Sequence, residues 1–474
     1  MAKLSSLYVK TYTSKKFLII ISIVTSALIV DISLSNISDM IRVSTDWGIA
    51  AFISISVVYA LGQYLILQFV QQKTKTIRIK SSHFNKLCII ITITQYVLTG
   101  IIAAVVLQTF VNSYYYSSFL IWNLSISYSM AGFLIIILTL KFFSWYRSSR
   151  NLIVLAYGLS AAIISISIVS VLIFINAILL AMPTKVTPQL GVTLEHKGEA
   201  GHGPDIRKFD QITMLGKVQT VFAISRVLSF LSLWASTVLL LYSYSQKLGK
   251  VKFWIIISIP LASFVSIFII ITPFVLGSSY PTDTTVKIMV DALGYTMPAL
   301  SSSILFGLPF WMIARTMRYG SILIDYLIIA SSGLVLFELA STGNVILGSY
   351  PPLGFASVSF VGLSSYLLLM GIYSSAISIS TDQKLRLYIR NTAKEESKLL
   401  DSIGSADMEQ RIVKKVMGVT RALSKNTIEN SGVQPSITED DIKQYLGQVL
   451  SEVKKRKTSI KENNNNSKNR RDKL

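Results

Sequence analysis

Ten stretches of mostly apolar residues recur along the chain, and each is about long enough to cross a membrane as a helix. A helix needs roughly 20 apolar residues to span the ~30 Å hydrocarbon layer. Within lipid, a helix satisfies its backbone hydrogen bonds internally, whereas an isolated strand does not. The sequence therefore predicts an all-α, polytopic transmembrane helix bundle over residues 1–380. The expected spans are 17–34, 48–70, 87–111, 118–143, 152–182, 218–244, 253–277, 293–313, 321–340 and 353–379.

The composition agrees with a membrane protein. Hydrophobic residues make up 51% of the chain, only 15% of residues are charged, and the mean hydropathy is +0.55. A soluble domain carries more charge than this. The single cysteine, Cys88, allows no intramolecular disulfide. The first apolar stretch follows several lysines but lacks a small-residue cleavage site, so we interpret it as a retained span and not as a signal peptide.

Positive charge alternates between the segments that connect the spans. The segments on one side of the expected membrane hold 17 Lys and Arg residues and no acidic residue, whereas the opposite loops hold seven basic and eight acidic residues. Cytoplasmic loops of membrane proteins carry an excess of Lys and Arg, so we expect both termini in the cytoplasm. This topology also accounts for the net charge of +21, and no nucleic-acid partner is predicted.

Three regions outside the spans have their own composition. Residues 183–217 are expected to form a long external loop, because they contain Gly, Pro and charged residues. Residues 381–457 are polar and helical in pattern, which predicts a cytoplasmic helical region, and residues 458–474 are expected to be disordered. Directly after the last span come basic side chains that we expect to face anionic lipid headgroups, namely Lys384, Arg386 and Arg390.

Two amphipathic helices are predicted in the cytoplasmic region. Ser405 is a capping residue before the first helix, whose apolar stripe consists of Met408, Ile412, Val416, Val419 and Leu423. Thr438 is a capping residue before the second helix, which has an acidic start and a basic end. The apolar face of the second helix consists of Ile442, Tyr445, Leu446, Val449 and Val453. Such faces need a partner, so a protein partner or self-association through the tail is predicted.

The sequence predicts no catalytic, cofactor-binding or metal site. None of the three histidines (positions 83, 196 and 202) lies within an expected span, which argues against an intramembrane metal or haem centre. His196 and His202 share the external loop with several carboxylates, so a weak metal site there is the alternative to a solvated polar loop. No glycine-rich phosphate-binding loop is present. An enzyme is therefore not predicted.

Ionisable side chains within the spans are the strongest functional candidates, because a charge at the centre of a bilayer costs at least ~2.5 kcal/mol. They are Asp31, Arg226, Asp325 and Glu338. Arg226 lies near the same side of the membrane as Glu338 and Asp31, which predicts a pair with Glu338 or, as a second choice, with Asp31. Alternatively, both carboxylates reach the outer headgroups and Arg226 snorkels. Asp325 is expected at the inner interface.

Prolines concentrate in two adjacent spans and predict helix kinks. Each proline removes a backbone donor and bends or breaks its helix. Such kinks mark substrate sites in some transporters and are plain bends in other bundles. The first five spans contain no corresponding pair, so an inverted-repeat transporter is not predicted. The prolines are Pro260, Pro273, Pro298 and Pro309.

The segment 350–380 carries a family resemblance. It begins Tyr-Pro-Pro-Leu-Gly-Phe-Ala, ends Tyr-Ser-Ser-Ala-Ile-Ser-Ile-Ser, and is followed by a basic helix. This segment resembles a stretch of uncharacterised archaeal multi-pass membrane proteins. The resemblance covers under a tenth of the chain and implies a prokaryotic plasma membrane, with no particular activity and no functional residue to carry over.

These features predict a non-enzymatic membrane sensor, adaptor or assembly subunit that acts through its cytoplasmic helical tail. The apolar faces of the tail support this function. A carrier or channel for a small solute is the alternative, supported by the buried charges and by the proline-containing spans.

Overall fold

The computed structural model describes most of the expected spans and part of the tail. The described residues are 2–37, 45–80, 82–180, 185–186, 214–242, 244, 249–266, 296–317, 321–342, 350–392, 398–431, 441, 444, 445, 448, 449 and 452. The elements within them are α1 (Ala2–Ile37), α2 (Thr45–Lys80), α3 (Ser82–Asn112), β1 (Tyr115–Tyr116), α4 (Ser117–Ser149), α5 (Leu152–Leu180), β2 (Lys185–Val186), α6 (Met214–Tyr242), α8 (Lys250–Ser266), α11 (Met297–Thr316), α12 (Ser321–Ala340), α13 (Phe355–Thr381), α14 (Gln383–Thr392) and α15 (Lys398–Ser431).

Within these residues, nine helices are long and apolar enough to cross a membrane. Each overlaps one of the predicted spans, which confirms a helical, multi-pass membrane protein. The nine segments are Lys15–Ser35, Asp46–Lys75, Phe84–Asn112, Ser117–Ser149, Leu152–Phe174, Thr220–Tyr242, Met297–Thr316, Ile322–Ala340 and Phe355–Thr381. Of the predicted span 253–277, the structure describes α8 as far as Ser266, and the rest lies outside the described residues.

Several helices continue beyond their predicted ends. The span expected to end at residue 70 belongs to α2, which continues to Lys80, so Lys73 lies in the helix and not in a loop. Likewise α4 continues to Ser149. The next residue, Arg150, is the C-cap: its φ of 54° is left-handed, and its N–H donates to the Tyr146 carbonyl. Lysine and arginine favour helices, and their long stems cover apolar surface while the charge reaches polar surroundings. A basic run therefore does not end a membrane helix.

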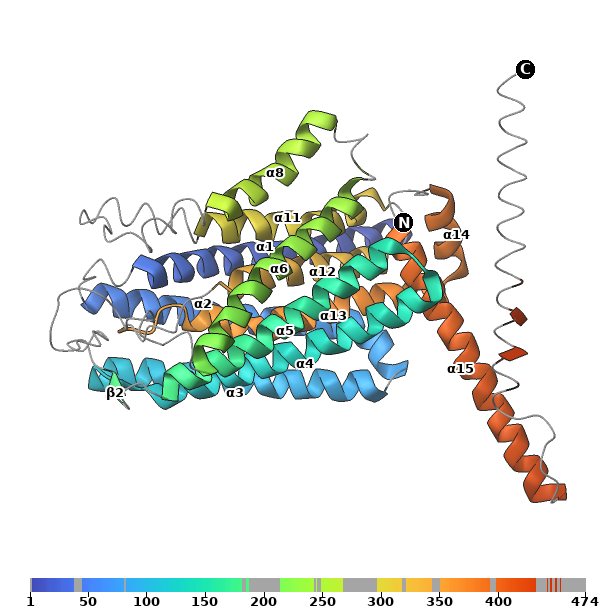
Figure 1. The fold of residues 1–474 in the computed structure, drawn as a ribbon, viewed down its shortest axis with the longest axis horizontal. Helices are drawn as coiled ribbons and strands as arrows, with labels where there is room; N and C mark the ends of the chain where they lie inside the picture. Colours follow the sequence, from blue (N-terminus) through green and yellow to red (C-terminus); the bar gives the residue numbers. More distant parts are fainter. Residues whose placement is uncertain are drawn as a thin grey trace. The chain divides into compact units, whose positions relative to one another are not determined.

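The innermost element is α13, which is surrounded by other helices of the bundle. The apolar window of its span is 100% buried, and α13 packs against α12, α4, α2, α3 and α1. Figure 1 shows these helices running alongside one another. Gly333 on α12 and Gly371 on α13 permit the closest of these approaches, because a Cβ at either would collide with the backbone of the partner helix.

One end of the bundle carries a small antiparallel strand pair. Tyr115 pairs with Val186 and Tyr116 with Lys185. Tyr115 is fully buried and stacks on Tyr350 with a centroid distance of 6.3 Å. Strand geometry explains this burial: successive side chains point to opposite faces, so the middle tyrosine turns inward. Its burial raises the pKa of the Tyr115 hydroxyl.

Tyr114 and Tyr116 both contact the ammonium group of Lys185. Lys185 Nζ lies 5.1 Å from the centroid of the Tyr114 ring and 5.8 Å from that of Tyr116. These distances are within the range of a cation–π interaction. The strand pair therefore joins the connection between α3 and α4 to the start of the predicted external loop, most of which (187–213) lies outside the described residues.

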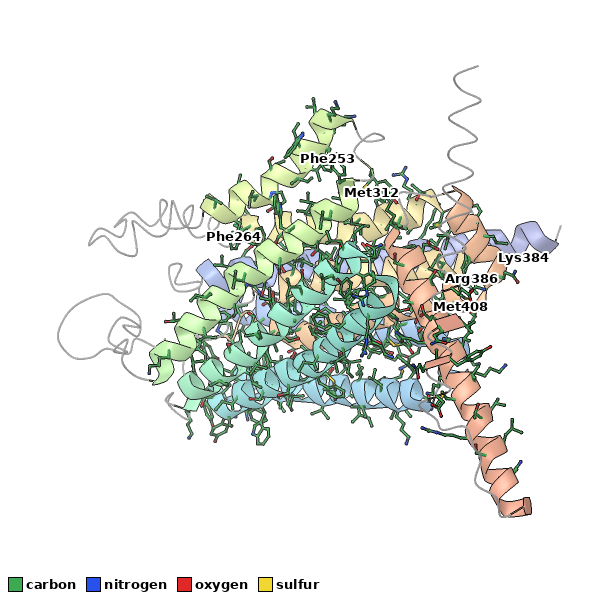
Figure 2. The ribbon with its side chains drawn as sticks, turned by 45° about the vertical axis from the view of Figure 1, so that its right-hand side comes forward. Phe253, Phe264, Met312, Lys384, Arg386 and Met408 are labelled. Carbon is green, nitrogen blue, oxygen red and sulfur yellow. The ribbon has the colours of Figure 1, made fainter. Side chains whose placement is uncertain are left out.

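The helix α8 contains Pro260 and packs against α11 and α6. Its contacts include a hydrogen bond from Trp234 Nε1 to the Ile257 carbonyl (3.1 Å) and a stack of Phe264 on Phe230 (3.9 Å). Phe253 and Phe264 mark the two ends of α8 in Figure 2.

The chain divides into two compact units, Met1–Gly404 and Ser405–Leu474, which are described separately. We predicted Ser405 as a helix cap, and this prediction was wrong: α15 begins at Lys398 and passes through Ser405 without a break. Leucine and isoleucine before Ser405 extend the apolar pattern by two turns, so the helix starts earlier. In the second unit Arg411 Nε donates to Asp407 Oδ2 at 2.7 Å, one turn away on the same helix.

Candidate functional site

The four predicted intramembrane charges lie at three separate places in the bundle. Asp31 lies at the start of α13, Asp325 pairs with a lysine on α2, and Arg226 lies beside Glu338. Asp31 is not the partner of Arg226.

Asp31 on α1 is fully buried and accepts hydrogen bonds from the start of α13. Its Oδ1 accepts the Gly354 N–H at 2.8 Å, and its Oδ2 accepts the Ser357 N–H at 2.9 Å and the Ser357 hydroxyl at 2.6 Å. The first N–H groups of a helix lack partners within the helix, and the helix dipole favours an anion there. Asp31 is thus a helix cap supplied by another helix, not a headgroup contact.

Asp325 on α12 forms a close ion pair with Lys73 on α2. Lys73 Nζ lies 2.8 Å from Asp325 Oδ2, and the side chains are 14% and 5% exposed. The ammonium also lies 5.3 Å from the centroid of the Phe69 ring, and the Tyr326 hydroxyl donates to the Lys73 carbonyl. We expected Asp325 to be a charge at the inner interface. The continuation of α2 past residue 70 instead brings Lys73 to it.

Arg226 and Glu338 are farther apart than Lys73 and Asp325, and each forms a hydrogen bond with a serine hydroxyl. Arg226 Nη2 lies 3.9 Å from Glu338 Oε1, beyond hydrogen-bond distance. Arg226 Nη1 donates to Ser341 Oγ at 3.0 Å, and Ser302 Oγ donates to Glu338 Oε1 at 3.3 Å. The two charged side chains are 32% and 13% exposed. This cluster joins α6, α11 and α12, and we call it the Arg226 cluster.

The Arg226 cluster has the chemistry of a charged binding site. Arg226 Nη2 does not form a hydrogen bond with Glu338, so the guanidinium and the carboxylate each have capacity for a further partner. What the cluster can do is bind a small ion or polar solute at the boundary of three helices.

The predicted proline kinks fall at different positions in their helices. Pro309 lies inside α11 and Pro260 inside α8, whereas Pro273 lies outside the described residues. Pro298 lies in the first turn of α11, so it does not kink this helix as predicted. A proline is tolerated there because the N–H that it lacks has no acceptor in the helix. Pro298 precedes Ser302 of the Arg226 cluster by one turn.

A small apolar cavity lies deeper in the bundle, between α4, α5, α6, α12 and α13. Its volume is about 20 Å³, and the lining includes Leu138, Phe142, Tyr157, Leu233 and Leu368. This volume is close to that of a single water molecule. The cavity is therefore a packing gap and not a solute site.

The tail interaction face is described only in part. Tyr445 is 66% exposed and Val449 is 37% exposed. Ile442, Leu446 and Val453 lie outside the described residues, as do His196 and His202 of the alternative metal site. On α15, Ile412, Val419 and Leu423 of the predicted stripe are exposed, by 43%, 52% and 60%.

Sequence reasoning missed a set of buried neutral side chains. Gln63, Gln95 and Asn123 lie within the expected spans, and each is at most 1% exposed. The available signal was the presence of a carboxamide in a membrane span, since buried polar groups in lipid are costly unless they are paired.

The comparisons with known proteins add no family assignment. The chain matches no protein-family model, no curated protein and no solved structure.

Proposed function

We propose that this multi-pass membrane protein is a non-enzymatic sensor, adaptor or assembly subunit that acts through its cytoplasmic helices. We further propose that the apolar stripe of α15, formed by Ile412, Val416, Val419 and Leu423, binds the same stripe of a second copy of the chain. In this proposal both termini lie in the cytoplasm of an archaeal cell and the bundle lies in its plasma membrane. The distribution of Lys and Arg and the resemblance of residues 350–380 support this placement.

The observation that carries the proposal is the exposed apolar stripe of α15. Ile412, Val419 and Leu423 are exposed by 43%, 52% and 60% on a 34-residue helix, and Val416 lies between them on the same face. Exposed apolar side chains at one-turn spacing are typical of a surface that binds another helix.

The spacing of the stripe favours a second copy as its partner. Ile412, Val416, Val419 and Leu423 follow one another at intervals of four, three and four, which is the spacing of a coiled-coil seam. Lys414 and Arg421 lie on the opposite face of the helix, away from the seam. Two identical helices can therefore meet along the stripe without bringing these like charges together.

The short helix α14 provides a further contact for the membrane. Leu385 and Ile389 are buried, whereas Lys384 is exposed, and the N–H groups of Lys384 and Leu385 donate to Asp382 Oδ1 at the start of the helix. Figure 2 labels Lys384 and Arg386 on this helix. We infer that Lys384, Arg386 and Arg390 bind anionic lipid headgroups.

Disulfide crosslinking in membranes tests the dimer seam. On a Cys88→Ser background, we expect Val419→Cys to form an oxidant-induced dimer of the full-length chain, because the seam brings two copies of residue 419 together. Arg421→Cys, on the opposite face of the same turn, is the matched control and should stay monomeric. Equal crosslinking at both positions, or none at either, contradicts a seam between copies.

The second candidate is a carrier or channel for a small charged solute, and the Arg226 cluster favours it. Its guanidinium and carboxylate are 3.9 Å apart and partly exposed, so a solute could separate them without breaking a close ion pair. Uptake into proteoliposomes that is abolished by Arg226→Ala and retained in Val419→Ser would favour this function over the first.

A further inference from the structure

Four helices contribute neutral polar side chains to one buried cluster, which is separate from the Arg226 cluster. We call it the amide cluster. Its members are Tyr59 and Gln63 of α2, Gln95 and Thr99 of α3, Asn123 and Ser127 of α4, and Ser359 of α13. Six of the seven side chains are buried, and Thr99 is half-buried. No member carries a charge.

Hydrogen bonds connect these side chains across the helix interfaces. The Tyr59 hydroxyl donates to Gln95 Oε1 at 3.3 Å, and Gln63 Nε2 donates to Thr99 Oγ1. Asn123 Nδ2 donates to Ser359 Oγ at 2.7 Å, and Ser127 Oγ donates to the Val358 carbonyl at 2.7 Å. These bonds form two sets, one between α2 and α3 and one between α4 and α13, and Gly362 of α13 lies close to both Gln95 of the first set and Ser127 of the second.

Each of the three carboxamides nevertheless has one unpartnered end. Among the described residues, Gln63 Oε1, Gln95 Nε2 and Asn123 Oδ1 have no hydrogen-bond partner. The three side chains are 1%, 0% and 0% exposed, so bulk solvent does not reach them. Rotating a carboxamide by half a turn exchanges its oxygen and nitrogen but still leaves one end unpaired. A buried polar atom without a partner costs about as much as a lost hydrogen bond.

Gly362 of α13 lies next to one of these ends. A Cβ at this position would lie 3.6 Å from Gln95 Nε2 and 3.3 Å from the Ser127 carbonyl oxygen. Two free acceptors and one free donor therefore belong to the same cluster.

From this arrangement we propose that the amide cluster binds one small neutral molecule that both donates and accepts hydrogen bonds. Water has this chemistry, and so does the hydroxyl or carboxamide group of a small uncharged solute. The ligand donates to Gln63 Oε1 or Asn123 Oδ1 and accepts from Gln95 Nε2. The absence of a charged member from the cluster favours a neutral ligand over an ion.

The first test is a structure of the full-length protein in lipid nanodiscs at a resolution that shows ordered water. We expect a non-protein peak within hydrogen-bond distance of Gln95 Nε2 and of at least one carboxamide oxygen. A map in which the three carboxamides pack only against protein overturns the proposal.

Thermal unfolding then distinguishes a solute from water. Glycerol, urea and acetamide serve as probes, and the protein is the full-length wild type or Asn123→Leu. Gln71→Met is the matched control, because Gln71 lies on the same helix as Gln63 but bonds Thr92 at 2.9 Å outside the cluster. If a solute binds, one probe raises the melting temperature saturably in wild type and Gln71→Met, and not in Asn123→Leu.

A peak without any such probe effect assigns the site to water and also supports the proposal. Should Asn123→Leu fail to fold, Gln63→Met replaces it, because it removes the other free acceptor. The proposal fails if the map shows no peak and every probe shifts wild type and variant equally.

Discussion

The carboxylate of Asp31 accepts both the backbone N–H and the hydroxyl of Ser357, at 2.9 and 2.6 Å, across 326 positions of sequence. This contact joins the first helix of the bundle to α13, the helix that the others enclose. Helix ends buried away from water need acceptors for their first N–H groups. A carboxylate from α1 meets this need, so the packing of α1 and the start of α13 depend on each other.

Replacing Asp31 with Ala should lower the free energy of unfolding by about 2 to 3 kcal/mol, because buried donors lose a charged acceptor. Asp31→Asn keeps one acceptor oxygen and should cost less. Thermal unfolding of the purified protein in nanodiscs measures both changes, and Asp46→Ala, at an exposed position in the first turn of α2, is the control. A variant at position 31 that unfolds like the control contradicts the capping role.

The Lys73–Asp325 pair should behave as a buried ion pair. Removing either charge alone, in Lys73→Met or Asp325→Asn, should destabilise the protein by about 3 to 5 kcal/mol, because the other charge stays buried without a partner. The double variant should be more stable than either single variant. A double variant whose loss equals the sum of the two single losses would argue against a direct interaction between these side chains.

The Arg226–Glu338 pair should couple more weakly. Its atoms are 3.9 Å apart, and the Arg226 side chain is 32% exposed, so solvent and the serine hydroxyls share the charges. In a double-mutant cycle with Arg226→Ala and Glu338→Ala, we expect a coupling energy of about 0.5 to 1 kcal/mol. Additive shifts in melting temperature would show that the two side chains act independently.

The helical membrane bundle follows from the sequence, because lipid requires backbone hydrogen bonds within each segment. For the same reason the predicted span 118–143 is correctly located, although α4 extends to Ser149. Its boundary was too short because hydropathy marks where a helix leaves the hydrocarbon layer and not where the helix ends. For the same reason the predicted span 48–70 left Lys73 in a loop, although α2 continues to Lys80.

The site was predictable only as a set of residues. Four charges in apolar stretches are visible in the sequence, but their partners depend on which helices become neighbours. Asp31 illustrates this limit: its partners are the N–H groups of Gly354 and Ser357, and backbone groups carry no sequence signal. The unpartnered carboxamide atoms of Gln63, Gln95 and Asn123 could not be predicted for a related reason. The hydropathy of a span does not show which of its faces packs against another helix.

Single cysteines test the predicted topology. On a Cys88→Ser background, cysteines at Ser38, Glu199 and Thr282 should react with impermeant thiol reagents added outside the cell, whereas those at Ser82 and Ser405 should not. Replacing Cys88 itself should matter little for labelling, because this side chain is buried. Labelling of both sets from one side would contradict the predicted ten spans.

The second tail helix separates the two candidate functions. Replacing Ile442, Leu446 and Val449 with Ser removes the apolar face but keeps the predicted cap and end charges, and each buried side chain of this kind contributes roughly 1.5 to 3 kcal/mol. If the protein acts through its tail, the triple variant should still insert in the membrane and should lose its association and its cellular phenotype. A carrier should keep its transport after this change and lose it in Arg226→Ala. Chemical crosslinking in membranes and solute uptake by proteoliposomes measure the two outcomes. A triple variant that associates like wild type, together with an Arg226→Ala variant that no longer transports, would replace the adaptor with the carrier.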